Sequence, residues 1–183
     1  MTDWFYIWDT RSAFGWAVLS GSPKGARRFD FGYASREHCL GHARVFADCA
    51  GPDTIPHDRL LAHPGPNKGP AWLFPAVVAL TRFFLAEDVP LNLVPLDWTR
   101  RTDFEKAVWR ATLRIPYGET RPYAWVAAQA GRPGGARAAG NALGANPLPV
   151  IVPCHRVIKS DGALGGFGLG AAMKRKLLAT EIR

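Results

Sequence analysis

The chain has few cysteines and no long hydrophobic run. Its 183 residues include three cysteines, an odd number that makes a poor disulfide framework and favours a reducing compartment. No apolar run reaches the ~18 residues of a spanning helix, and Met1–Trp8 lacks a basic stretch followed by a cleavage site, so we expect neither a membrane span nor a secretory signal. The 48% share of hydrophobic residues excludes a mostly disordered chain.

Negative charge is scarce in the second half of the chain. Residues 1–99 hold 9 Lys and Arg against 10 Asp and Glu, whereas residues 100–183 hold 14 against 5. The surplus behind the net charge of +8 therefore lies entirely after residue 99. A basic segment beside a neutral one favours a polyanionic partner such as nucleic acid, although the same surplus is compatible with a solubility feature.

The first third of the chain has the pattern of a small antiparallel sheet. Short aromatic and β-branched segments at Trp4–Trp8, Phe14–Ser20 and Ala26–Tyr33 are separated by turn residues, which predicts a three-stranded meander. Helical spacing follows in Ser35–Cys49.

The next segments predict a loop, a helix and a linker. Five prolines in Gly51–Pro70 predict a loop rather than a regular element. Trp72–Ala86 has the composition of a second helix, and Val89–Trp98 is extended and punctuated by proline. We therefore place a domain boundary near residue 98, where the charge also changes.

The second half has mostly helical patterns. Thr102 and Glu105 form the sequence signature of a capping box at the start of a helix. Two short helices, about Tyr123–Ala130 and Gly134–Ala145, flank a turn that contains Gly131 and Pro133. In a basic segment this pair favours a DNA-binding helix-turn-helix, although many helical hairpins bind nothing.

Cys154 is the candidate nucleophile. It follows Val150–Val152, which we interpret as a short buried strand, and His155 stands beside it as a candidate base. The glycine-rich segment 162–170 could fold over a site there. The alternative is that Cys154 is simply a small buried hydrophobic residue.

The surroundings of Cys154 resemble a known family. The chain is similar to the O6-alkylguanine-DNA alkyltransferases, also called methylated-DNA–protein-cysteine methyltransferases, over almost all of residues 103–181. The motifs that carry the resemblance are Pro116-Tyr117-Gly118-Glu119-Thr120, Tyr123, Ala136-Arg137-Ala138, Gly140, Asn146-Pro147, Pro153-Cys154-His155-Arg156-Val157, Gly162-Ala163 and the helix Lys174–Glu181.

The resemblance implies an α/β fold with two domains. Residues 1–98 match the family only in layout, a small antiparallel sheet with helices of ribonuclease H-like type. Residues 99–183 would form a mostly helical domain, similar to a winged helix-turn-helix, that binds DNA and accepts the alkyl group.

The resemblance also assigns chemical roles. Cys154 would take the alkyl group as a thiolate, His155 would accept its proton through a water, and Glu181 would orient His155. Asn146 would brace the active-site turn, and Tyr123 would donate a proton to guanine N3. The alternatives for these residues are packing for Tyr123, a solvated position for Glu181 and an ordinary hydrogen bond for His155.

The remaining expected site residues contact DNA or the base. Arg137 would replace the everted base in the stack, and its helix would approach DNA closely through small residues. The expected DNA-binding residues are Arg137, Tyr123, Gly134, Gly135, Ala136 and Ala138. The expected pocket residues are Leu143, Arg156, Val157, Phe167 and Gly168. Phe167 and Gly168 stand where many family members carry Tyr-Ser, which puts the preferred alkyl group in doubt.

A metal site is the weaker interpretation of the N-terminal histidines. His38 and His42 share a helix face at the i, i+4 spacing that zinc can use. Cys49 lies about two helical turns beyond His42, too far for one tetrahedral site. We expect Cys39 to pack in the core and expect no metal.

The resulting hypothesis is direct-reversal DNA repair. We expect a monomer that binds duplex DNA carrying O6-alkylguanine, or O4-alkylthymine, and is alkylated once on Cys154 without a dissociable cofactor. It would work in the cytoplasm with the nucleoid, or in a nucleus, and not at a membrane. The alternatives are a non-catalytic binder of alkylated DNA and a helix-turn-helix regulator.

Overall fold

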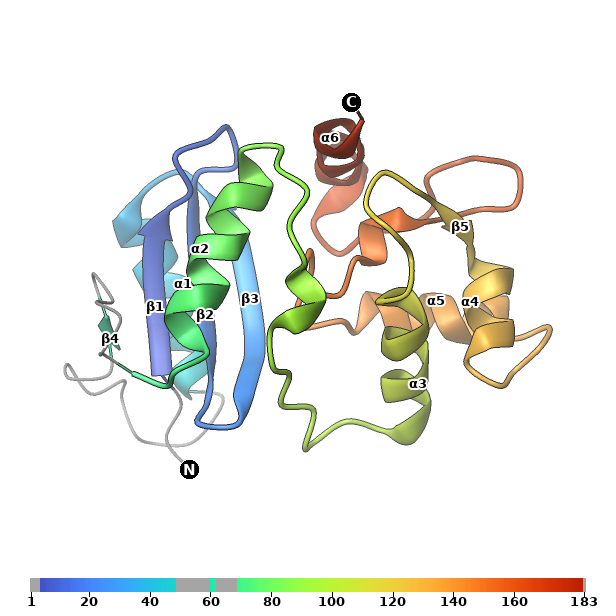
Figure 1. Ribbon diagram of the computed structural model, residues 1–183, viewed down its shortest axis with the longest axis horizontal. Coiled ribbons are helices and arrows are strands. Elements are labelled where there is room, and N and C mark those ends of the chain that lie inside the picture. The colour runs from blue at the N-terminus through green and yellow to red at the C-terminus, as the bar shows by residue number, and fades with distance from the viewer. Residues whose placement is uncertain (1–3, 49–59, 62–68, 183) are drawn as a thin grey trace. The chain divides into compact units, whose positions relative to one another are not determined.

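A computed structural model describes residues 4–48, 60–61 and 69–182 of the chain (Figure 1). These residues form an α/β fold in two compact units, Met1–Asp97 and Trp98–Arg183. No helix within the described ranges is long and apolar enough to cross a bilayer.

The first unit contains the predicted antiparallel sheet. Strands β1 (Trp4–Asp9), β2 (Trp16–Ser22) and β3 (Gly25–Tyr33) pair in the order β3-β2-β1. The prediction that Gly51–Pro70 holds no regular element is wrong at one point, because β4 (Leu60–Leu61) pairs in parallel with β1 at Phe5 and Tyr6. Two residues are too few to give a periodic signal.

Two helices cover opposite faces of this sheet (Figure 1). Phe5 and Ile7 of β1 pack with Cys39 of α1 (Arg36–Asp48). On the other face, the Phe29 and Phe31 rings lie 6.2 and 5.1 Å from Phe84, the last residue of α2 (Leu73–Phe84). The alternation of side chains along a strand therefore fills two apolar layers, which explains the aromatic content of this half.

The predicted linker is part of the first unit rather than a free connection. Leu91–Leu93 forms a short 3-10 helix, η1, and Val89, Leu91 and Val94 are buried. The amide of Ala26 donates to Pro95 O and the amide of Asp97 donates to Ala26 O, each at 2.8 Å. The sequence predicts an extended linker here, but buried apolar side chains and two backbone hydrogen bonds anchor the segment to β3.

The second unit is mostly helical. Its helices are α3 (Asp103–Thr112), α4 (Tyr123–Gln129), α5 (Ala136–Gly144) and α6 (Gly170–Glu181). The capping box of Thr102 and Glu105 is confirmed at the start of α3. A small parallel pair that the sequence did not predict joins β5 (Arg121–Pro122) to β6 (Val157–Ile158) and ties the residues after Cys154 to the start of α4.

Candidate active site

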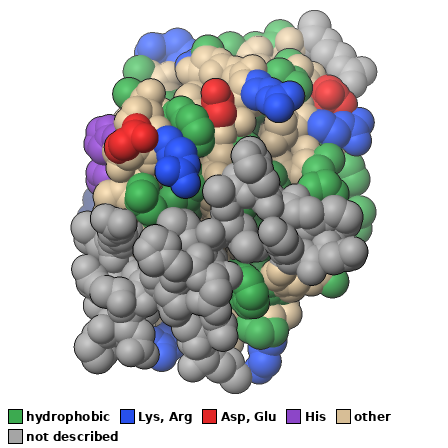
Figure 2. Space-filling model, turned by 90° about the vertical axis from the view of Figure 1, so that its left-hand side faces the viewer, with side chains coloured by type: hydrophobic (Ala, Val, Ile, Leu, Met, Phe, Trp, Pro, Cys, Tyr) green, Lys and Arg blue, Asp and Glu red, His purple; other side chains and the backbone are tan. Residues whose placement is uncertain are grey.

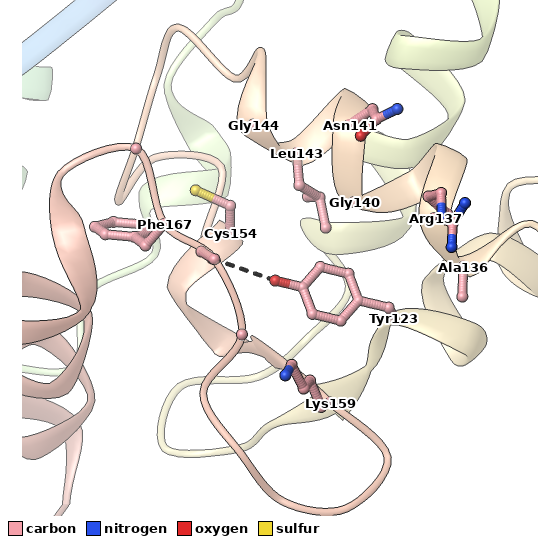
Figure 3. A pocket seen from close by; sticks show the side chains of 13 residues that line it. Tyr123, Ala136, Arg137, Gly140, Asn141, Leu143, Gly144, Cys154, Lys159 and Phe167 are labelled. Atoms are coloured by element: carbon pink, nitrogen blue, oxygen red, sulfur yellow. Dashed lines mark hydrogen bonds between the residues drawn. The ribbon is translucent and has the colours of Figure 1, made fainter.

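A cavity of about 630 Å³ lies within the second unit, and Cys154 is in its wall (Figure 3). Other parts of the wall come from α4, α5 and the glycine-rich segment, through Tyr123, Leu143, Phe167 and Gly168 among others. Cys154 is only 7% exposed. The cavity volume is within the range of sites that bury a small organic ligand.

The chain reaches Cys154 through a tight turn, so the predicted strand Val150–Val152 is wrong. Pro149 and Val152 form an isolated bridge, and Val150 has φ +73°. All three residues of the predicted strand are buried, which explains why their apolar sequence resembles a strand. A 3-10 turn, η2 (Cys154–Arg156), follows and leads into β6.

Asn146 holds this turn together. Its Nδ2 group donates to Val152 O at 3.0 Å and to the sulfur of Cys154 at 3.1 Å, while its Oδ1 accepts from the amide of Leu148 at 3.0 Å. Three bonds from one side chain thus fix the position of the sulfur relative to the backbone around it.

A buried network joins the cysteine turn to the end of α6. Nε2 of His155 lies 2.7 Å from Oε1 of Glu181. Arg156 donates to both carboxylate oxygens of Glu181, at 2.9 and 3.0 Å, and to Ile115 O at 2.7 Å. The amide of Gly118 donates to Glu181 Oε2 at 3.0 Å. The carboxylate is therefore held from three directions.

The environment of each group sets its protonation. Burial lowers the pKa of His155, although Glu181 opposes this. Burial alone would raise the pKa of Glu181, but the hydrogen bonds and charges of His155 and Arg156 outweigh it and hold the pKa below its ordinary value. Near neutral pH His155 is thus neutral and Glu181 ionised, so Nε2 of the imidazole carries the proton that the carboxylate accepts, and Nδ1 is its basic nitrogen.

The Cys154 thiol is protonated in the free protein. Burial raises its pKa, and the Asn146 amide, the charge of Lys174 and nearby backbone amides oppose this increase. A base is therefore needed to generate the thiolate at neutral pH.

Lys174 is a functional candidate that the sequence interpretation did not single out. It is fully buried in α6, and its ammonium donates to Val157 O at 2.5 Å, to Leu164 O, and to Gly166 O at 3.4 Å. Its charge interacts with Cys154, and burial lowers its own pKa to about 8. Lys174 stands in the basic run Lys174-Arg175-Lys176, so the sequence gives no signal that this lysine is the buried one.

Tyr123 lies against the glycine-rich segment. Its hydroxyl donates to Gly166 O at 3.2 Å, as the dashed line in Figure 3 shows. A Cβ atom at Gly165 would come within 2.8 Å of the same hydroxyl oxygen. The glycine at position 165 therefore permits the close approach of ring and backbone, and its φ of +70° also favours glycine.

Five of the six predicted DNA-binding residues lie at or just before the start of α5, and the sixth, Tyr123, begins α4. The helix begins at Ala136 instead of Gly134, because Gly134 has φ +79° and Gly135 is the N-cap residue. Arg137 is exposed and lines the cavity together with Ala136. Ala138 is half-buried on the same helix, whose inner face packs on α3 and α4.

Two residues expected in the pocket are not in its wall. Arg156 is directed to Glu181 and Ile115, because its guanidinium satisfies a buried carboxylate. Val157 is fully buried, and its carbonyl accepts from Lys174. The predictions for Leu143, Phe167 and Gly168 do agree with the wall of the cavity.

The N-terminal histidines form an aromatic cluster. The rings of His38 and His42 lie 5.3 Å apart, and both contact Tyr33. Figure 2 shows histidine side chains on the surface of this unit. Within the described ranges no group of three His, Cys, Asp or Glu side chains is placed to hold a metal ion, and Cys49 lies outside those ranges.

Comparisons with known proteins agree with this arrangement. The sequence profile described as "6-O-methylguanine DNA methyltransferase, DNA binding domain" matches residues 103–183. A methylated-DNA–protein-cysteine methyltransferase of Methanosarcina barkeri is 47% identical over 172 residues, which cover 93% of this chain and 92% of that protein. The chain belongs to the methylated-DNA–protein-cysteine methyltransferase family.

Other members of this methyltransferase family extend the comparison. A mycobacterial enzyme of the same name, from Mycobacterium bovis, is 51% identical over 110 residues, but the match covers only 58% of this chain and 63% of that relative. The crystal structure of Mycobacterium tuberculosis OGT in complex with DNA has a TM-score of 0.67 and 36% identity, and covers 97% of this chain and 91% of that one. The family fold thus extends over both units.

Proposed function

We propose that this chain repairs alkylated DNA by moving an alkyl group from guanine O6 to Cys154, once per molecule. The observation that carries the proposal is a cysteine in the wall of a cavity of about 630 Å³, which has room for a nucleobase, beside a buried His155–Glu181 pair. The names of the family members and the DNA complex of the mycobacterial OGT support the same substrate.

The proposed reaction is a single displacement. The basic nitrogen of His155, kept neutral by burial, accepts the thiol proton through a water, and Glu181 stabilises the resulting imidazolium. The sulfur lone pair forms a bond to the alkyl carbon while the bond from that carbon to O6 breaks. The electron pair of the broken bond stays on the guanine, which takes up a proton. A thioether cannot transfer the group back easily, so the protein is consumed.

Tyr123 and Arg137 serve the everted base in this proposal. The Tyr123 hydroxyl, now bonded to Gly166 O, would exchange that acceptor for guanine N3 and donate the proton as the base leaves. Arg137 is exposed at the start of α5 beside the cavity, where it can fill the gap that the everted base leaves in the stack.

The same proposal includes the folds of the two domains and duplex DNA as the partner. Residues 1–98 form a ribonuclease H-like domain, and residues 99–183 form a domain similar to a winged helix-turn-helix in which α4 and α5 bind the minor groove. The protein acts as a monomer on duplex DNA, in the compartment that holds the genome. The charge surplus after residue 99 supports the nucleic acid partner.

The competing function is that of a lesion binder without chemistry. An excess of duplex whose O6-methylguanine has a radiolabelled methyl group distinguishes alkyl transfer from lesion binding when it is mixed with the protein. Transfer predicts label on the protein that reaches a plateau at one methyl per chain, and loss of transfer with retained DNA binding in Cys154→Ala. A binder predicts a complex on a native gel and no label on the denatured protein.

A further inference from the structure

Among the residues that the structure describes, the wall of the cavity contains two charged side chains, and both are cations. They are Arg137, at the start of α5, and Lys159, directly after β6. Figure 3 shows them on different sides of the Tyr123 ring. The function proposed above uses Arg137 in the base stack and gives Lys159 no role.

The backbone of Lys159 is fixed by a tight turn. Its amide donates to Ala163 O at 2.8 Å, and the amide of Gly162 donates to its carbonyl at 3.1 Å. Asp161 Oδ1 accepts from the amide of Ala163, so that carboxylate is engaged within the turn. Lys159 is exposed, and within residues 4–48, 60–61 and 69–182 it forms no ion pair. Its ammonium is thus available at the rim of the cavity.

An everted nucleotide presents anions at this rim. When the base enters the cavity, the two adjacent phosphodiesters stay outside with the sugar that joins them, because each phosphodiester carries a charge that the apolar wall cannot solvate. A lysine on a flexible stem contacts phosphate as a point charge and does not read sequence.

We propose that Lys159 binds a phosphate next to the everted nucleotide and so stabilises the extrahelical state. The inference rests on the proposed function, and it extends the site from the alkylated base to the backbone of the lesion strand. Lys159 is therefore a binding residue for DNA, with no part in the transfer of the alkyl group itself.

The test compares the wild type, Lys159→Gln and Lys159→Arg in single-turnover transfer. The substrates are a duplex containing O6-methylguanine, the same duplex with a neutral methylphosphonate on the 5′ or the 3′ side of the lesion, and free O6-methylguanine base. Lys106→Gln is the matched control, because it removes the same charge from α3 outside the cavity wall. Thermal unfolding of each variant checks that the exposed substitution leaves the fold intact.

We expect Lys159→Gln to slow transfer from the unmodified duplex about three- to tenfold relative to Lys106→Gln, and to lower the slope of log affinity against log salt by about 1. On one of the two methylphosphonate duplexes this difference between the variants should disappear. Free O6-methylguanine base should react equally fast with the wild type and with Lys159→Gln. Lys159→Arg should restore the transfer rate on the unmodified duplex. An unchanged rate in Lys159→Gln, a loss that persists on both methylphosphonate duplexes, or an equal loss with free base would overturn the inference. If the wild type accepts no methyl group from any substrate, the proposed function fails with it.

Discussion

Nε2 of His155 and Oε1 of Glu181 are 2.7 Å apart, and both side chains are buried. Arg156 shares the same carboxylate, so one acid organises both residues that follow Cys154. Because an ionised carboxylate can only accept, the neutral imidazole places its proton on Nε2 and keeps Nδ1 as the basic nitrogen. The network links the C-terminal end of α6 to the chemistry of the cysteine turn.

Glu181→Gln should destabilise the protein strongly. It leaves the Arg156 guanidinium buried without its anion, which costs about 3–5 kcal/mol. The pKa of Glu181 is below its ordinary value of 4.5, so its stabilising effect is present above that pH and is lost as the pH falls through the folded-state value. Urea unfolding at neutral and acidic pH measures the difference, which should shrink in acid.

The matched control for this prediction is Glu119→Gln. Glu119 pairs with Arg121 at 2.6 Å, but both side chains are more than a third exposed, so the loss should be about 0–1 kcal/mol. Equal losses for the two variants would contradict a structural role for the buried network.

The rate of transfer should have a plateau at neutral pH. The pKa of His155 is below its ordinary value of 6.5 and the pKa of the Cys154 thiol is above its ordinary value of 9.0. Between these values the neutral imidazole can accept the thiol proton, and the rate does not depend on pH. Single-turnover rates from pH 5.5 to 9 should therefore fall only on the acid side, below pH 6.5.

The same profile in His155→Ala tests the role of the base. Without the imidazole, the thiolate must form by free ionisation, so the rate should rise about tenfold per pH unit through neutral pH. A plateau in the variant would show that another group accepts the proton.

Lys174→Met should lower the thiolate fraction of Cys154 below about pH 8, where the Lys174 ammonium is charged. The variant lacks the buried cation that opposes the effect of burial on the thiol. A shift of one unit lowers the thiolate fraction at pH 8 about tenfold. Iodoacetamide labelling of the Cys154 peptide, measured by mass spectrometry over a pH series, reports the thiolate fraction at each pH.

Cys39 is an internal reference in the same labelling series. Burial raises its pKa to about 12, so it should stay unlabelled in the wild type and in the variant. If Lys174→Met changes the labelling rate of Cys154 by the same factor below and above pH 8, Lys174 holds the backbone of the glycine-rich segment and does not tune the thiol.

Gly165→Ala should impair both stability and transfer. The added Cβ would lie 2.8 Å from the Tyr123 hydroxyl oxygen and must displace the ring or the segment. Gly162→Ala is the control, because its φ of +83° gives similar backbone strain while its Cβ meets open space. We expect both variants to lose about 1 kcal/mol from strain, and only Gly165→Ala to lose transfer. Equal transfer rates in Gly165→Ala and Gly162→Ala would show that the contact between Gly165 and Tyr123 has no role in transfer.

The sequence predicted those helices and strands whose formation depends on residues close together in the chain. The capping box at Thr102 and Glu105 uses side chains three residues apart, and aromatic and β-branched segments between turn residues mark β1 to β3 directly. The two-residue strands β4, β5 and β6 depend on partners far along the chain, so no periodicity could show them.

The site was predictable where the residues of one motif also lie close together in the structure. Cys154 and Asn146 lie together as the family motif implied, because both belong to one turn. The direction of Arg156 was not predictable, since a sequence does not say which buried carboxylate a guanidinium will satisfy. Lys174 was missed for the same reason, because its partners are backbone carbonyls on β6 and the glycine-rich segment.

The most direct test of the central claim is the mass of the Cys154 peptide after reaction. The wild type and Cys39→Ala are each incubated with duplex containing O6-methylguanine, digested and analysed by tandem mass spectrometry. We expect a gain of about 14 Da on Cys154 in both proteins, because methyl replaces the thiol hydrogen. An unmodified Cys154 in protein that binds the lesion, or a methyl group on another residue, would contradict it.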